Sequence, residues 1–193
     1  MISLNKYVQE KLVVNKNYNI KYYPKSWNEL RQIILDKFKE LGPGTEQAPI
    51  DFNDVDVSEM TTFYNLSTRQ GVFDSTKFEY IDISNWDVSK VENMSYVFCQ
   101  CDNLKSVGDI SNWNILNLEK TYAMFLLCKN LISIGDLSKW KILKVEDMRY
   151  MFSECRNIKS VGDLNKWDVS NVEYMKHMFY NTGITNIPDW YKE

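Results

Sequence analysis

The chain repeats itself every 27 residues. Residues 109–135 read DISNWNILNLEKTYAMFLLCKNLISIG, and the next 27, DLSKWKILKVEDMRYMFSECRNIKSVG, match them in pattern without a gap. A fixed period of about 20–50 residues indicates a repeat architecture, in which each unit buries its apolar face against its neighbours. Residues that recur at this spacing include Trp86, Trp113, Trp140 and Trp167, and Phe98, Phe125, Phe152 and Phe179.

Each unit divides into two parts. The segment LKSVGDIS (104–111) is typical of a short strand and turn, and VENMSYVFCQC (91–101) carries one apolar stripe at helical spacing, preceded by the capping-box pair Ser89 and Glu92. One strand and one short helix per unit predict an α/β repeat solenoid, a leucine-rich-repeat-like right-handed coil. We expect short parallel strands near 78–83, 104–110, 131–137, 158–164 and 184–188, in one sheet, and short helices between them.

The N-terminal part differs from the repeats. Residues 1–48 are predicted to form a separate segment, and residues 49–193 the solenoid. A helix is expected at about 26–42, because Ser26 and Glu29 form a capping box and Gly42 follows the last apolar residue. Repeat arrays need a terminal element over their first unit, so this helix is predicted to be an N-terminal helical cap around 57–63. Residues 3–12 carry a second, shorter amphipathic pattern.

The repeated units, with LKSVGDIS, the tryptophan and VENMSYVFCQC in fixed order, resemble the BspA-like leucine-rich repeat family over about residues 50–190. The resemblance implies binding and adhesion without catalysis. Surface members of that family carry a signal or lipoprotein sequence, and the N-terminus MISLNKYVQEKLVVNKN shows no apolar region of that type. The expected location is therefore the cytoplasm of the producing cell, or a virion if the chain is phage-encoded.

Charge narrows the range of partners. The net charge is −3, and residues 51–193 carry 15 Lys and Arg against 21 Asp and Glu. An acidic body argues against nucleic acid as the main partner. The sequence also lacks the run of about 18 apolar residues that a membrane helix needs, so no membrane partner is expected.

Catalytic chemistry is not indicated. The single histidine, His177, stands in a variable slot of the repeat, and we find neither a phosphate loop nor an HExxH motif. Three of the four cysteines, Cys101, Cys128 and Cys155, follow the period, so we expect reduced, inward-facing thiols rather than a zinc site. The chain is predicted not to be an enzyme and to need no cofactor or metal.

One column of acidic residues could do more than shape the fold. Stacked carboxylates repel one another, so something must compensate them. They could accept hydrogen bonds from their own turns, they could bind a cation, or they could meet a basic partner. Together with two lysines of a variable slot they form the candidate interaction surface: Asp82, Asp109, Asp136, Asp163, Lys105 and Lys159.

Two functions remain. The first is a non-enzymatic protein–protein interaction or adhesion module, because apolar slots are kept while exposed slots vary. The alternative is a structural or packaged component of a tailed-phage virion, assembled into a larger particle. This alternative rests on the opening MISLNKYVQEKL, which is similar to the amphipathic N-termini of some phage proteins.

Overall fold

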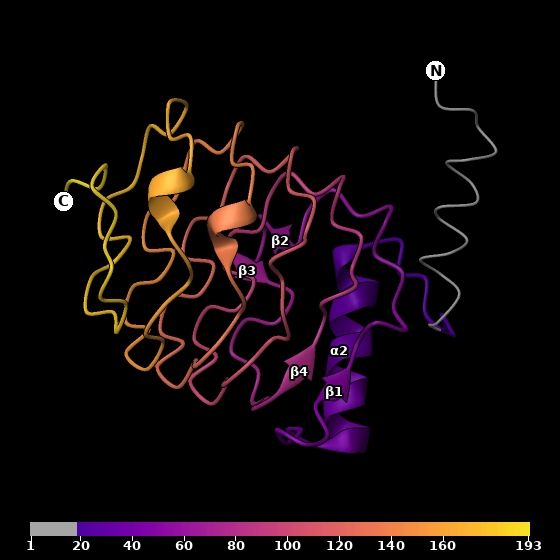
Figure 1. Cartoon of the computed structure of the whole chain (residues 1–193). Coiled ribbons are helices and arrows are strands. Elements are labelled where there is room, and N and C mark those ends of the chain that lie inside the picture. Colours follow the sequence, from indigo (N-terminus) through magenta and orange to yellow (C-terminus); the bar gives the residue numbers. More distant parts are fainter. Residues whose placement is uncertain (1–18) are drawn as a thin grey trace.

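The computed structural model describes residues 19–193. Within them lie one α-helix, α2 (Trp27–Leu41), and two 3-10 helices, η2 (Leu137–Lys139) and η3 (Leu164–Lys166). Strand β1 (Ile50–Asp51) pairs in parallel with β4 (Ile81–Asp82), and β2 (Tyr64–Asn65) pairs antiparallel with β3 (Gln70–Gly71). Figure 1 shows α2 at one end of the molecule, with the rest of the chain extending away from it toward residue 193.

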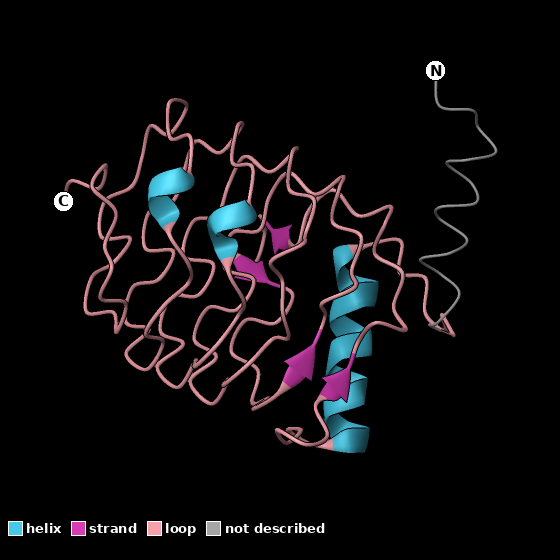
Figure 2. Ribbon diagram, in the orientation of Figure 1, coloured by secondary structure: helices cyan, strands magenta, loops and turns pink. Residues whose placement is uncertain are grey.

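The predicted α/β repeat solenoid, a leucine-rich-repeat-like coil, is wrong. The described residues hold one α-helix outside the repeats and two small two-stranded sheets, and most of the chain in Figure 2 is loop and turn. Of the single parallel sheet expected, β4 forms within 78–83, while Ser106 and Ser133 make only isolated bridges. The helices η2 and η3 each begin at the last residue of a predicted strand.

The helix predicted at 91–101 is also absent, and backbone hydrogen bonding explains why. Alternate N–H groups of this segment donate to carbonyls of the following unit, as in Tyr96 to Tyr122 (2.9 Å) and Phe98 to Met124 (2.9 Å). An α-helix would use these N–H groups within the segment. Tyr96 and Gln100 instead adopt left-handed φ values of 60° and 57° and close tight turns.

The 27-residue period is expressed as contacts between equivalent side chains. Phenylalanine rings form one buried stack with centroids 5.1–5.9 Å apart: Phe73, Phe98, Phe125, Phe152 and Phe179. Indole rings stack at 6.3–6.5 Å from Trp113 through Trp140 and Trp167 to Trp190. Trp86 lies against Phe63 and Phe73 instead. The repeated apolar slots therefore form one continuous core.

Buried thiols follow the phenylalanine stack. The Sγ atoms of Cys101, Cys128 and Cys155 each lie 2.9–3.0 Å from the carbonyl oxygen of a phenylalanine in the preceding unit. All four cysteines are buried and unbridged. Burial raises the pKa of the Cys128 and Cys155 thiols, which keeps them protonated as hydrogen-bond donors. The inward orientation expected from the sequence is confirmed.

Helix α2 contacts the first unit through both apolar and polar groups. Ser26 is its N-cap, and the backbone turns left-handed at Gly42, where φ is 78°. Leu30 and Ile34 are fully buried, and the ring of Phe38 meets that of Phe78 edge-on at 5.0 Å. The guanidinium of Arg31 donates to the carbonyls of Val72 (2.7 Å) and Asp74 (3.0 Å). The amphipathic pattern at 3–12 lies outside the described residues.

Candidate functional site

The four predicted aspartates lie in one column, and each closes its own turn. The Oδ1 atom accepts a hydrogen bond from the backbone N–H two residues later: Asp82 from Ser84 (2.9 Å), Asp109 from Ser111 (2.9 Å), Asp136 from Ser138 (2.9 Å) and Asp163 from Asn165 (3.2 Å). These are Asx turns, in which the carboxylate replaces a backbone acceptor. The geometry favours the turn-forming interpretation among the three left open by the sequence.

Glycines in the adjacent unit make room for these carboxylates. A Cβ at Gly135 would lie 2.0 Å from Oδ1 of Asp109, and one at Gly162 would lie 1.8 Å from Oδ1 of Asp136. Both glycines also have left-handed φ values, of 93° and 91°. The Asp and Gly columns are therefore coupled across units: the side chain of one unit occupies the space beside the backbone of the next.

The turn hydrogen bonds shift the pKa of two aspartates of the column. Hydrogen bonds from the Ser111 hydroxyl and backbone lower the pKa of Asp109, and those from Ser138 lower the pKa of Asp136. Among residues 19–193, no group of three or more His, Cys, Asp or Glu side chains could hold a metal ion. The turn hydrogen bonds thus favour the ionised form of Asp109 and of Asp136.

Replacing two aspartates of this column by asparagine is expected to make the melting temperature less dependent on pH under acid conditions. A lowered folded pKa gives stabilisation that is present above the unfolded value, about 3.9, and is lost as pH falls through the folded value. Native protein should therefore lose melting temperature between about pH 5 and pH 2, and D109N/D136N should lose less over the same range. Asn keeps an oxygen acceptor for the turn but does not titrate.

The matched control for this experiment is E40Q/E46Q, which removes two exposed carboxylates elsewhere. Glu154 and Asp168, whose pKa values are also lowered by hydrogen bonds, still titrate in both variants. In D109N/D136N, the slope of melting temperature against pH should therefore be smaller than in native protein but not zero. Equal slopes for native protein and D109N/D136N would show that the column does not contribute.

The two predicted lysines occupy the same repeat slot two units apart, and an exposed isoleucine occupies it in the unit between them. Lys105 pairs with Glu79 (2.7 Å) and lies 5.4 Å from the ring centroid of Tyr80. Lys159 is exposed, and its Nζ lies 3.5 Å from the carbonyl oxygen of Arg156. Ile132 stands between them in the repeat and is 55% exposed. The structure therefore gives these lysines unequal surroundings.

A row of tyrosines, which the sequence analysis missed, lies along the repeated units. Its rings contact one another at centroid distances of 5.1–5.8 Å, in the order Tyr64, Tyr96, Tyr122, Tyr150, His177 and Tyr180. Most of these rings are half-buried, and Tyr180 is 54% exposed. We call these six residues the tyrosine row. Only Tyr96, Tyr150 and His177 share one repeat slot, so the 27-residue spacing alone could not reveal the continuous row.

Arg149 joins a further ring to the tyrosine row. Its guanidinium carbon lies 5.1 Å from the ring centroid of Tyr122 and 4.8 Å from that of Tyr174, which is 50% exposed. Asp147 accepts from the same guanidinium at 2.6 Å and raises the pKa of Arg149. A cation held between two tyrosine rings is stabilised by both ring quadrupoles.

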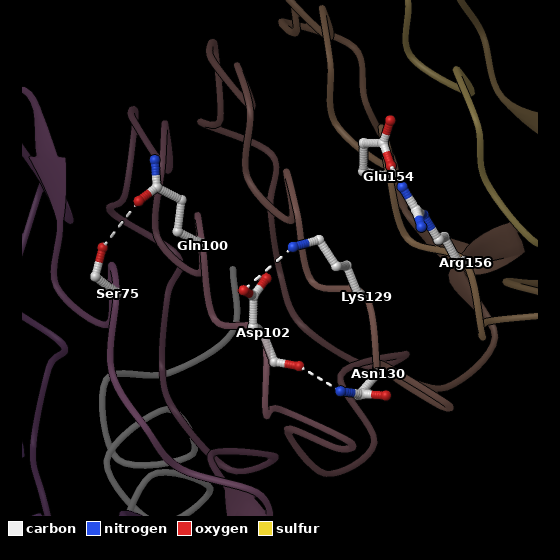
Figure 3. Close-up of polar contacts among 7 residues, drawn as sticks. All are labelled: Ser75, Gln100, Asp102, Lys129, Asn130, Glu154 and Arg156. Atoms are coloured by element: carbon white, nitrogen blue, oxygen red, sulfur yellow. Dashed lines mark hydrogen bonds and ion pairs between the residues drawn. The ribbon is translucent and has the colours of Figure 1, made fainter.

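Exposed and half-buried polar side chains of several units form hydrogen bonds and ion pairs, some of which Figure 3 shows. Lys129 pairs with Asp102 (3.2 Å), and Asn130 donates to the Asp102 carbonyl (2.7 Å). Farther along, Arg156 pairs with Glu154 (2.7 Å). The Lys129 and Asn130 contacts with Asp102 link one unit to the next, whereas Arg156 and Glu154 belong to the same unit. Ion pairs between largely exposed groups contribute little free energy.

The surface formed by residues 19–193 includes two open grooves near charged side chains. One, of about 570 Å³, lies between α2 and residues 43–51 and includes the buried Lys37, which is held by Asp54 at 2.6 Å. The other, of about 380 Å³, is polar and is lined by Glu119, Glu146 and Glu173 with Leu143, Lys144 and Asn171.

Comparisons with known proteins give one match. The sequence profile of a family described as "Mycoplasma protein of unknown function, DUF285" matches residues 65–190. No curated protein and no solved structure matches the chain. Within residues 19–193, no helix combines the length and apolar character needed to cross a bilayer.

Proposed function

We propose that the chain, which belongs to the DUF285 family of Mycoplasma proteins of unknown function, is a non-enzymatic module that binds a protein partner. The observation that supports this function is the tyrosine row with Arg149 and Tyr174 beside it. The proposal includes no catalytic step, cofactor or metal.

The chemistry of this surface suits a protein contact. Tyrosine offers a large apolar ring and a hydroxyl that hydrogen-bonds, and it loses little conformational entropy on binding because it has only two side-chain torsions. Tyrosine and arginine are enriched at protein interfaces for these reasons. Ring contacts along the row hold the side chains in place before a partner arrives, which lowers the entropic cost of association.

The aspartate and lysine surface named from the sequence stays a prediction. Its carboxylates are already engaged in turns, whereas the tyrosine row exposes side chains that no turn requires. The proposal therefore places the principal contact on the tyrosine row. The virion alternative rests on residues 1–12, which lie outside the described residues, and it also stays a prediction.

Capture of partners from lysate tests whether the chain binds a protein through the tyrosine row. Immobilised native protein and Y174S/Y180S would be compared in lysate of the producing organism, with bound proteins quantified by mass spectrometry. The matched control is Y23S/L35S, which removes exposed apolar groups elsewhere, 58% and 42% exposed. We expect Y174S/Y180S to recover about tenfold less of a partner that native protein and the control both retain.

Unchanged melting temperatures of all three proteins would show that the fold is intact. A partner retained equally by Y174S/Y180S and native protein would contradict the proposed contact surface. A turnover activity that co-purifies with the homogeneous chain would contradict the non-enzymatic assignment.

A further inference from the structure

We infer that the partner of the tyrosine row is a basic protein segment, whose arginine and lysine side chains pack against the exposed rings. This inference rests on the proposed function and adds the chemical class of the partner. Two independent features support it: a cation that the chain itself places among the rings, and a column of acidic residues in the units that carry the row.

Arg149 shows what these rings accept. Its guanidinium lies within 5.1 Å of Tyr122 and 4.8 Å of Tyr174, while Asp147 satisfies its charge. The arrangement of two tyrosine rings and one carboxylate around a guanidinium is therefore already formed on this surface. Arginine presents a planar, weakly hydrated cation, which makes it better suited than lysine to lie on an aromatic ring.

Other rings of the row have no such cation from within the described residues. Among residues 19–193, the cation–ring contacts involve Tyr22, Phe52, Tyr80, Tyr122 and Tyr174. Tyr150 and Tyr180 thus have rings in the row without a cation from these residues, and Tyr180 is more than half exposed. These are the positions that a partner's arginine or lysine would occupy.

The units that carry the row also carry a column of acidic residues. Glu92, Glu119, Glu146 and Glu173 recur every 27 residues, and Glu173 immediately precedes Tyr174. The backbone links them in series, since the N–H of Glu119 donates to Glu92, that of Glu146 to Glu119 and that of Glu173 to Glu146. None of the ion pairs within residues 19–193 includes these four glutamates. Lys144 lines the same groove as three of them, and its Nζ donates to Asn117 at 2.8 Å.

A basic segment offsets the cost of that column. Like charges at equivalent positions of neighbouring units repel one another, and a cation placed between them relieves the repulsion. A nucleic acid would meet the same carboxylates with its own negative charge, which disfavours it. Aromatic rings together with unpaired carboxylates therefore select a cationic protein segment over a polyanion.

A defined peptide tests the inference on the full chain. The probe is a fluorescent arginine–glycine peptide of about ten residues, with a lysine–glycine and a glutamate–glycine peptide for comparison. Fluorescence anisotropy would give the dissociation constants. We expect the arginine peptide to bind more tightly than the lysine peptide, the glutamate peptide not to bind, and binding to weaken about tenfold between about 50 and about 300 mM salt.

Charge-matched variants separate a local surface from diffuse attraction. E119Q/E146Q should weaken binding of the arginine peptide about fivefold, whereas E40Q/E46Q, with the same net charge but changed at exposed positions of α2 and the loop after it, should not. Y174S/Y180S should weaken it by a similar factor without changing the net charge. The inference would be overturned if E119Q/E146Q and E40Q/E46Q weakened binding of the arginine peptide equally, or if Y174S/Y180S did not weaken it.

The outcome for the native partner keeps the two proposals apart. A partner captured through the tyrosine row by an acidic or uncharged segment would overturn this inference and leave the proposed function standing. A partner captured without the tyrosine row would overturn the proposed contact surface, and this inference with it. Capture through the row by a segment rich in arginine and lysine supports both.

Discussion

Replacing Phe125 by alanine lowers the free energy of unfolding by about 4 kcal/mol, because it leaves a cavity in the middle of the phenylalanine stack. Phe125 is fully buried, and its ring lies 5.1 Å from Phe98 and 5.8 Å from Phe152. The loss combines the transfer free energy of the ring with the contacts that its neighbours forfeit, and a rigid stack can close such a cavity only in part. Urea denaturation followed by circular dichroism measures the change.

A second, less drastic substitution at the same position provides the control. F125L fills most of the volume and is expected to cost about 1.5 kcal/mol. Because each unit contacts its neighbours, the alanine variant should also broaden the transition, as units on either side of position 125 lose their mutual support. Equal stability of F125A and F125L would contradict the view that stacked rings hold the units together.

Replacing Arg31 by methionine is expected to cost about 3 kcal/mol, because it leaves two backbone carbonyls without a donor. The N–H groups of Phe73 and Ser75 donate to Val97 and Cys99, so the carbonyls on this side of each unit face the unit before it. In the first unit the corresponding carbonyls, of Val72 and Asp74, face α2 and accept from Arg31. Methionine keeps the apolar stem but supplies no donor.

Lys39 of the same helix provides the matched control, since it is exposed. K39M should change the free energy of unfolding by less than about 0.5 kcal/mol, while R31K, with a single donor group, should fall between K39M and R31M. Chemical denaturation of the three variants measures the order. Identical stability of R31M and K39M would show that α2 covers the first unit through its apolar contacts alone.

The sequence determined which residues are buried and how they repeat. Apolar and aromatic side chains at 27-residue spacing can bury themselves only by meeting their equivalents, and Phe98, Phe125 and Phe152 do so. The N-cap Ser26 and the terminating Gly42 of α2 could likewise be read locally, because capping depends on neighbouring residues alone. For the same reason, Asp followed two residues later by Ser or Asn indicated the turns of the aspartate column.

Only the tertiary structure decided how the backbone runs between those side chains. The spacing of Val91, Met94, Val97 and Phe98 fits a helix, yet the N–H groups of Tyr96 and Phe98 find carbonyls in the following unit. Two left-handed residues without glycine, Tyr96 and Gln100, allow this arrangement, and nothing local to their sequence signals it. The α/β solenoid was predicted wrongly because side-chain periodicity does not specify the partner of each N–H group.

The tyrosine row was hidden for a related reason. Tyr96 and Tyr150 share a repeat slot with Ala123, while Tyr122, which lies between them in space, belongs to the neighbouring slot. A column read at a fixed period therefore shows an interruption where the folded surface has a continuous run of rings. The sequence by itself determined the buried stack, whose members must occupy equivalent positions, and tertiary structure alone decided the surface, where side chains from different slots reach one another.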